Sequence, residues 1–172
     1  MPHDHSLQIY LENGTLAMDK GDFKTAGRNL LAALRKVRTR REPTEEHAIV
    51  LLKLARYYAR LERYVHAARY YNQALLACEA HYGIESLPVA DVLRQIADLY
   101  GMQSKFEQAG QIYMRALNLH SRLPEQNTNW LSYVAERLSQ VYFVQQKYHK
   151  SERWRKISRS MLSWNTSSGQ SS

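Results

Sequence analysis

Apolar side chains recur along this chain at intervals of three and four residues, the spacing that places them on one face of an α-helix. Val92, Ile96 and Leu99 form one such stripe, and a second stripe follows over 112–117 after a short polar turn. The pattern predicts helices throughout and no sheet. The eight expected helices cover about 5–19, 22–39, 45–60, 63–81, 87–102, 105–121, 128–145 and 148–163.

Four segments that follow the turns align with one another without gaps. They are GDFKTAGRNLLAAL (21–34), ERYVHAARYYNQAL (62–75), SKFEQAGQIYMRAL (104–117) and QKYHKSERWRKISR (146–159), at steps of 41, 42 and 42 residues. Each copy has an aromatic residue after the turn and small residues three and ten positions later. The small residues are Ala26, Ala67, Ala109 and Ser151, then Ala33, Ala74, Ala116 and Ser158. The chain therefore contains four copies of an internal repeat.

The segment before each turn repeats as well, with Gly14, Ala55, Ala97 and Ser139 in register. Small residues allow two antiparallel helices to cross closely. A single helical hairpin cannot bury both of its faces, so we expect successive hairpins to stack and share one core. The expected organisation is one domain over 1–164 and a disordered polar tail over 165–172, with repeats at about 8–41, 48–82, 90–123 and 132–163.

Several residues are expected to mark the helix ends. Ser6 and Thr44 are candidate N-caps, because a hydroxyl at that position can accept a hydrogen bond from the first turn. Gly83 suits a helix end, and Pro88 suits the first turn of the helix that follows.

The order of these features resembles the tetratricopeptide repeat. That pattern has a small residue in the first helix, an aromatic residue three positions on (here Tyr58, Tyr100 and Tyr142), a turn, a second aromatic residue and two alanines. The period of about 42 residues and the junction HYGIESLPVADVLRQIADLY are similar to the repeats of kinesin light chains. The resemblance implies a right-handed α-α superhelix of four helical hairpins that binds a peptide or protein partner as an adaptor or scaffold.

In such a superhelix the first helix of each hairpin lines the concave groove. The partner-binding residues that this implies are Leu52, Lys53, Arg56, Arg60, Asp91, Arg94, Gln95, Asp98, Tyr133, Arg137 and Gln140. The centre of this set is basic, so the hypothesis is an acidic segment held by forked arginine–carboxylate bonds. The alternative is a solvated face on which Asp91 and Asp98 pair with the nearby arginines.

The charge balance leaves two further hypotheses open. The 24 Lys and Arg residues outnumber the 16 Asp and Glu residues, for a net charge of +8, which suits nucleic acid or an anionic surface. Basic residues gather in RKVRTRR (35–41) and in the last predicted helix, where apolar residues also occur. That helix could mediate self-association as a structural subunit, or it could pack its apolar residues on the preceding hairpin and expose its basic ones.

No arrangement typical of catalysis, cofactor binding or metal binding is present in the sequence. It holds no glycine-rich phosphate loop, no His-Glu-x-x-His and no paired cysteines, and His3, Asp4 and His5 offer only a poorly spaced set of metal ligands. We expect neither an enzyme nor a cofactor. The single cysteine, Cys78, and the lack of a secretory signal or a membrane-spanning run predict a cytoplasmic location.

Overall fold

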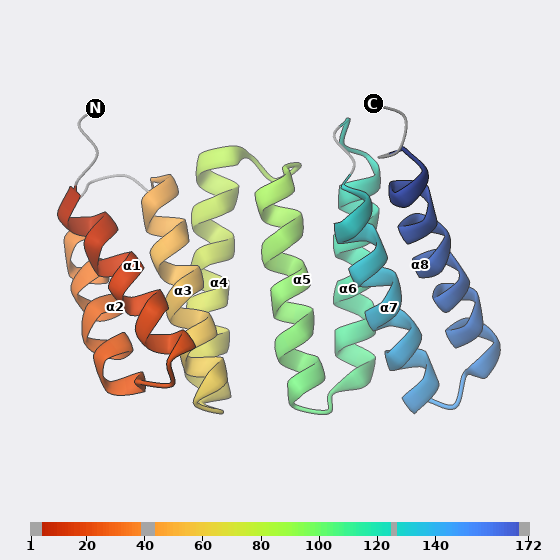
Figure 1. The fold of residues 1–172 in the computed structure, drawn as a ribbon, viewed down its shortest axis with the longest axis horizontal. Helices are drawn as coiled ribbons and strands as arrows, with labels where there is room; N and C mark the ends of the chain where they lie inside the picture. The colour runs from red at the N-terminus through yellow and green to blue at the C-terminus, as the bar shows by residue number, and fades with distance from the viewer. Residues whose placement is uncertain (1–4, 39–43, 125–126, 169–172) are drawn as a thin grey trace. The chain divides into compact units, whose positions relative to one another are not determined.

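A computed structural model describes residues 5–38, 44–124 and 127–168, with side chains described as far as Leu162 in the last helix. These residues form eight helices and no strand, which confirms the all-α prediction (Figure 1). The helices are α1 (His5–Asp19), α2 (Phe23–Arg38), α3 (Glu45–Arg60), α4 (Tyr64–Tyr82), α5 (Leu87–Met102), α6 (Phe106–Ser121), α7 (Thr128–Val144) and α8 (Tyr148–Ser168).

The helix ends follow the capping rules at three of the four marked residues. The Thr44 hydroxyl accepts a hydrogen bond from the backbone N–H of His47, at 3.3 Å. Gly83 ends α4 with a φ of 85°, and Pro88 lies in the first turn of α5. The prediction for Ser6 is wrong, because α1 already includes His5 and the Ser6 hydroxyl accepts a hydrogen bond from the Lys36 ammonium group of α2.

The end of α8 also departs from the expected boundary. The helix runs to Ser168, so residues 165–168, assigned above to the polar tail, are helical, and 169–172 lie outside the described residues. Adding a residue to an existing helix gains a backbone hydrogen bond without a new nucleation cost, which explains how a polar sequence continues it.

The same turn closes all four hairpins. One residue in each turn has a left-handed backbone, namely Gly21, Glu62, Ser104 and Gln146, with φ of 76°, 57°, 58° and 59°. The next residue donates its N–H five positions back, from Asp22 to Ala17 and from Lys147 to Tyr142 in the first and last hairpins. This backbone bond satisfies a carbonyl at the end of the first helix. The sequence repeat is therefore also a repeat of backbone conformation.

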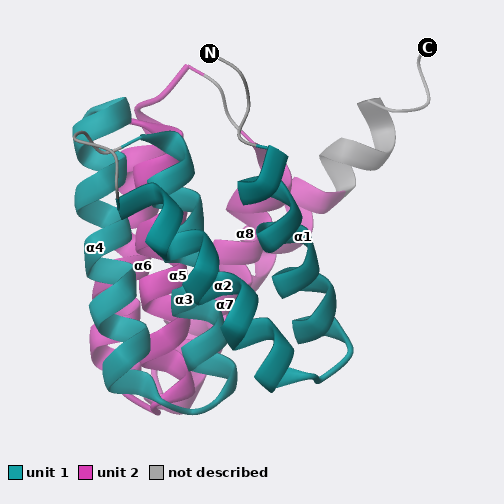
Figure 2. Cartoon of the chain, turned by 90° about the vertical axis from the view of Figure 1, so that its left-hand side faces the viewer, with its two compact units in different colours: residues 1–84 teal, residues 85–172 magenta. Residues whose placement is uncertain are grey.

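The chain divides into two compact units, residues 1–84 and 85–172 (Figure 2). In the first unit α2 packs against both α1 and α3, and α3 packs against α4. In the second unit α6 packs against both α5 and α7, and α7 packs against α8. Within each unit the hairpins therefore nest in chain order, as the stacking argument predicts.

Small residues occupy the contacts between helices. The eight residues that recur after the turns are all buried, with exposures between 0% and 3%. Two glycines show how close these contacts are: a Cβ on Gly14 would lie 2.9 Å from Leu30 Cδ2, and a Cβ on Gly27 would lie 2.5 Å from the Tyr57 hydroxyl oxygen. A larger side chain has no room at these positions, which explains why the core contains glycine and alanine there.

The second unit has a core at the junction of α5, α6 and α7. Its buried members are Ala97, Ala109, Tyr113, Val134, Leu138 and Val141. Phe106, the aromatic residue after the turn, packs against this cluster and fills the space beside the small residues. Tyr113 is 2% exposed, and its hydroxyl group points from the core toward Asp98 of α5. This core therefore positions the polar groups of the site described next.

Candidate functional site

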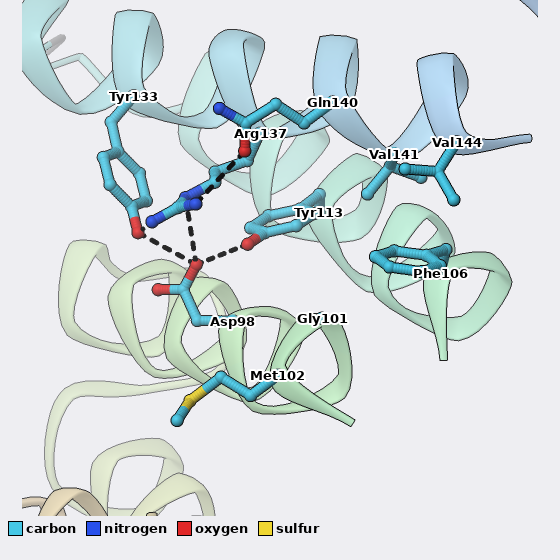
Figure 3. A pocket seen from close by; sticks show the side chains of 10 residues that line it. All are labelled: Asp98, Gly101, Met102, Phe106, Tyr113, Tyr133, Arg137, Gln140, Val141 and Val144. Carbon is cyan, nitrogen blue, oxygen red and sulfur yellow. Dashed lines mark hydrogen bonds and ion pairs between the residues drawn. The ribbon is translucent and has the colours of Figure 1, made fainter. Parts of the chain in front are cut away.

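A pocket of about 460 Å³ lies in the second unit, where α5, α6 and α7 meet (Figure 3). Polar side chains gather on one side of it, and Phe106, Val141 and Val144 lie on the other. Its lining residues are Asp98, Gly101, Met102, Phe106, Tyr113, Tyr133, Arg137, Gln140, Val141 and Val144. A concave surface with an apolar wall and a few convergent polar groups is typical of a binding site.

Asp98 is the centre of the polar side. Its carboxylate accepts hydrogen bonds from the hydroxyl groups of Tyr113 and of Tyr133, the second at 3.0 Å. It also accepts one from Arg94 at 3.0 Å, and Arg137 Nε lies 3.8 Å away. Burial and the negative charge of Asp98 raise the pKa of Tyr113, so this tyrosine keeps its proton and remains a donor. Asp98 is thus fully engaged and holds three helices together.

Arg94 continues this network along α5. Its guanidinium donates to Asp91 at 2.8 Å and 2.9 Å and to Asp98, so it lies between two carboxylates. Burial lowers the pKa of Arg94, but the two aspartates outweigh that effect and raise it overall. Gln95 and the Trp130 indole also donate to Asp91. The charge of Arg94 is therefore neutralised within the protein.

Arg137 is the cation that the network leaves accessible. Its Nε donates to the Tyr133 hydroxyl at 3.0 Å and its Nη1 donates to Gln140 at 3.2 Å. Its side chain is 44% exposed, and Nη2 makes no hydrogen bond to the described residues. Both guanidinium groups, of Arg94 and Arg137, lie 5.0 Å from the centre of the Tyr133 ring. Tyr133 thereby orients Arg137 at the edge of the pocket.

The apolar side is open because of one glycine. A Cβ on Gly101 would have no atom of another element within 4 Å, so this position faces open space. Met102 and Val144 are each 52% exposed beside it, so two large apolar side chains next to Gly101 are open to solvent. The structure thus places an uncovered apolar surface next to a guanidinium group.

The structure distributes the predicted groove residues over both units. In the second unit it brings Asp91, Arg94, Asp98, Tyr133, Arg137 and Gln140 into one hydrogen-bonded network. Gln95 belongs to the same network but is only 4% exposed, so it faces the core. With two arginines and two aspartates, this part of the set is charge-balanced. Arg94 pairs with both aspartates, as expected for the alternative in which the charges of this face pair with one another.

The other four predicted residues belong to α3 of the first unit. Lys53 Nζ donates to the Thr15 hydroxyl at 2.7 Å, and burial, followed by repulsion from Arg56, lowers the pKa of Lys53. Arg60 lies 3.8 Å from Asp19 and 5.7 Å from the centre of the Phe23 ring, while Leu52 is half-buried. Their role in partner binding stays a prediction.

The prediction missed six lining residues. Phe106, Tyr113 and Val141 were assigned to the core or not assigned, and Gly101, Met102 and Val144 carried no signal by themselves. The repeat register held one clue. At the position of Gly101 the first, second and fourth repeats have Met18, Ala59 and Phe143, so only the third repeat lacks a side chain there.

No protein-family model matches this chain, and no curated protein matches it. Solved structures do match. BtubC (BKLC) from P. vanneervenii has a TM-score of 0.85 at 22% sequence identity, over 93% of this chain and 64% of that one. The fold is that of TPR-like helical repeats. This chain therefore spans less than two thirds of the BtubC chain.

Two crystal structures from Podosopora anserina agree with this assignment. They are described as nearly identical TPR-like repeats of a kinesin light chain. Their TM-scores are 0.78 and 0.74 at 13% identity, over 95% and 99% of this chain and 78% and 79% of theirs. At such identities the comparison establishes the fold, which is the fold that the repeat register and the resemblance predicted.

Other predicted features have simpler outcomes. Within the described ranges no helix is long and apolar enough to cross a membrane, and no group of three or more His, Cys, Asp and Glu side chains could hold a metal ion. His3 and Asp4 lie outside the described residues, as does the end of the basic segment 35–41. Cys78 is buried in α4.

Proposed function

We propose that this chain is a protein-interaction scaffold that holds a peptide segment of a partner protein in the pocket of its second unit. The observation that carries the proposal is the pairing of an uncovered apolar wall, opened by Gly101, with the accessible guanidinium of Arg137. The TPR-like fold supports a binding role, because stacked hairpins present extended surfaces to partners.

The chemistry of the pocket suggests what the segment carries. A volume of about 460 Å³ accommodates a large apolar side chain together with part of the neighbouring backbone. Arg137 can donate from Nη2 to an acceptor next to that side chain. A carboxylate fits best, because a charged acceptor forms the stronger bond to a guanidinium. The proposed ligand is therefore an apolar residue adjacent to an acidic one.

The pocket also sets the limits of the earlier groove hypothesis. Arg94 does not act as a free anchor, because it already pairs with Asp91 and Asp98. Replacing it with glutamate would place three carboxylates together and disturb α5. A charge reversal there would not distinguish lost binding from lost structure. Gly101 and Arg137 are better sites for a test.

The test is selection from a random 12-residue peptide library displayed on phage, with the full chain as bait. We expect wild-type protein to enrich sequences with a large apolar residue beside Asp or Glu. Gly101→Leu should lose them, because the new side chain enters the pocket from a position where a Cβ meets no other element within 4 Å. Gln108→Leu, which adds the same side chain at an exposed position of α6 outside the pocket, is the matched control and should retain them.

The Arg137→Gln variant separates the two halves of the pocket. We expect it to weaken peptides with an acidic residue by about tenfold, the effect of losing one charge-assisted hydrogen bond, while peptides with amide replacements change little. Recovery of the same peptides by wild-type and Gly101→Leu protein would contradict the proposal. So would the absence of any enriched sequence.

A further inference from the structure

The positive charge of the second unit is concentrated in α8. Residues 148–168, which form α8, contain five Lys and Arg side chains and one acidic residue, Glu152. Residues 85–147 contain six basic and six acidic side chains, so that part is neutral. The excess is therefore a property of one helix and not of the whole surface.

The basic side chains of α8 are exposed and mostly unpaired. Glu152 pairs with Arg155 at 3.4 Å and so leaves no acid for the others. Arg153, Lys156 and Arg159 are exposed and make no hydrogen bond or ion pair with the described residues. Lys150 lies 5.7 Å from the centre of the Tyr142 ring. Unpaired cations on one helix are a strong local source of positive potential.

The outer side of α8 differs from the side of α6 that contacts the next hairpin. In α6 the residues that face α7 include Gly110, whose Cβ would lie 3.1 Å from Val141, and His120, which stacks on Trp130. The register places Glu152 and Leu162 at these positions in α8. A glutamate where another helix needs a glycine is incompatible with close stacking, and a polar outer face is typical of a terminal capping helix. This argues against end-to-end assembly through α8 and leaves its charges accessible.

The composition of the exposed face distinguishes among acidic partners. In the described part of α8 the exposed large apolar side chains are Tyr148 and Leu162, at its two ends, and the exposed residues between them are His149, Lys150, Glu152, Arg153, Lys156, Arg159 and Ser160. A protein interface needs a desolvated centre with apolar anchors, and a helix on a membrane needs an apolar face in the lipid. Interfaces with nucleic acid are polar and strongly positive.

We propose that α8 binds the phosphate backbone of nucleic acid through Lys150, Arg153, Lys156 and Arg159. These residues recur every three positions, and at about 3.6 residues per turn they span about half of the helix circumference, with Arg153 and Lys156 between Lys150 and Arg159. Each of the four cations can neutralise one phosphate, so at most four phosphate contacts are expected. Binding depends on charge and not on base sequence, since the one aromatic side chain between Lys150 and Arg159, Trp154, is half-buried.

The test measures fluorescence anisotropy of a labelled 20-base-pair DNA with the full chain. With four phosphate contacts, the slope of log affinity against log salt concentration should be about −3.6, so affinity falls about 150-fold between roughly 50 and 200 mM salt. The Arg153→Gln/Lys156→Gln variant should lower the slope to about −1.8. The Lys105→Gln/Arg115→Gln variant has the same net charge and should keep the wild-type slope, because both of its positions lie outside α8.

Three results would overturn the proposal. One is no binding at the lower salt concentration, and another is an equal loss in both double variants. The third is tighter binding to polyglutamate, or to vesicles with anionic lipids, than to DNA at equal charge concentration. Circular dichroism of each variant shows whether the helices remain, which is expected because Arg153 and Lys156 are exposed and unpaired.

Discussion

The third and fourth hairpins solve the same packing problem with different residues. Where α5 and α6 cross, the recurring positions hold Ala90, Ala97, Ala109 and Ala116, and where α7 and α8 cross they hold Ser132, Ser139, Ser151 and Ser158. All eight residues are buried, with exposures from 0% to 4%. Alanine satisfies the contact by size alone, whereas each serine brings a hydroxyl group that needs a partner.

The serines find their partners in one another. Ser139 and Ser151 share a hydrogen bond of 3.2 Å across the two helices. The Ser132 and Ser158 hydroxyl oxygens lie 3.0 Å apart, and each also lies 3.1 Å from the other's backbone carbonyl oxygen, so both hydroxyl protons have an acceptor on the facing helix. The comparison teaches that the repeat requires a small residue at the crossing, and that polarity is tolerated only when it is matched on the facing helix.

The largest effect should come from exceeding the size limit. Ala109→Leu places extra carbons where α5 and α6 touch, and we expect it to lower the free energy of unfolding by about 1–3 kcal/mol or more. Urea denaturation followed by circular dichroism measures this change. Gln108→Leu, at an exposed neighbour, is the control, and an equal change in both variants would show that the crossing is not tightly packed.

A smaller effect should follow from adding polarity without a partner. Ala109→Ser buries one hydroxyl and should cost about 1 kcal/mol, since an unsatisfied buried group costs about 1–3 kcal/mol and serine can partly bond to its own helix. Adding Ala97→Ser recreates the pair seen at Ser139 and Ser151 and should recover part of the loss. A double-mutant cycle reports this coupling, and strictly additive costs would count against a specific hydroxyl pair.

The free energy of unfolding should depend on pH through His120 near the end of α6, whereas the equivalent position of α8 has no titratable group. His120 is 1% exposed and stacked on Trp130, while the equivalent residue of α8 is Leu162. Burial lowers the pKa of His120 from its usual 6.5, so the unfolded chain binds the proton more tightly than the folded one. Its contribution to stability is present above about pH 6.5 and is lost as the pH falls.

His120→Leu should therefore flatten the decrease in unfolding free energy between about pH 7 and 5. Equilibrium denaturation at several pH values compares the two proteins. His47, whose pKa burial and Arg38 also lower, remains in both, so the difference between the curves isolates His120. Parallel curves for wild type and variant would contradict this assignment.

The smallest effect should be seen when both members of a serine pair are removed. Ser139→Ala together with Ser151→Ala replaces a satisfied pair with the residues that α5 and α6 already use, and we expect a change within about 0.5 kcal/mol. Thermal unfolding detects it, with either single variant expected to be less stable than the double variant. A large loss in the double variant would mean that the pair also specifies helix orientation.

Most of the fold could be predicted because the repeat register carries it. Every helix end agrees within one residue except the end of α8, since small and aromatic residues mark the same crossing and turn in each copy. The left-handed turn residues were not recognised, because only Gly21 has the residue type that signals this conformation, whereas Glu62, Ser104 and Gln146 adopt it without that signal.

The site was predicted less completely for a physical reason. Spacing along a helix indicates which residues share a face, and it placed Asp98, Tyr133 and Arg137 together. It does not show which charges neutralise one another, and so it counted Arg94 as an available cation. Nor does it show empty space, which arises at Gly101 from what α6 and α7 leave uncovered.

The most direct test of the account is methyl NMR of the full chain, titrated with the acidic peptide that the library selection yields. We predict that the Met102 methyl resonance shifts with the peptide, because Met102 lines the pocket, and that the resonance of Met114, exposed on α6 outside it, stays in place. A shift at Met114 with none at Met102 would place the peptide elsewhere and contradict the central claim.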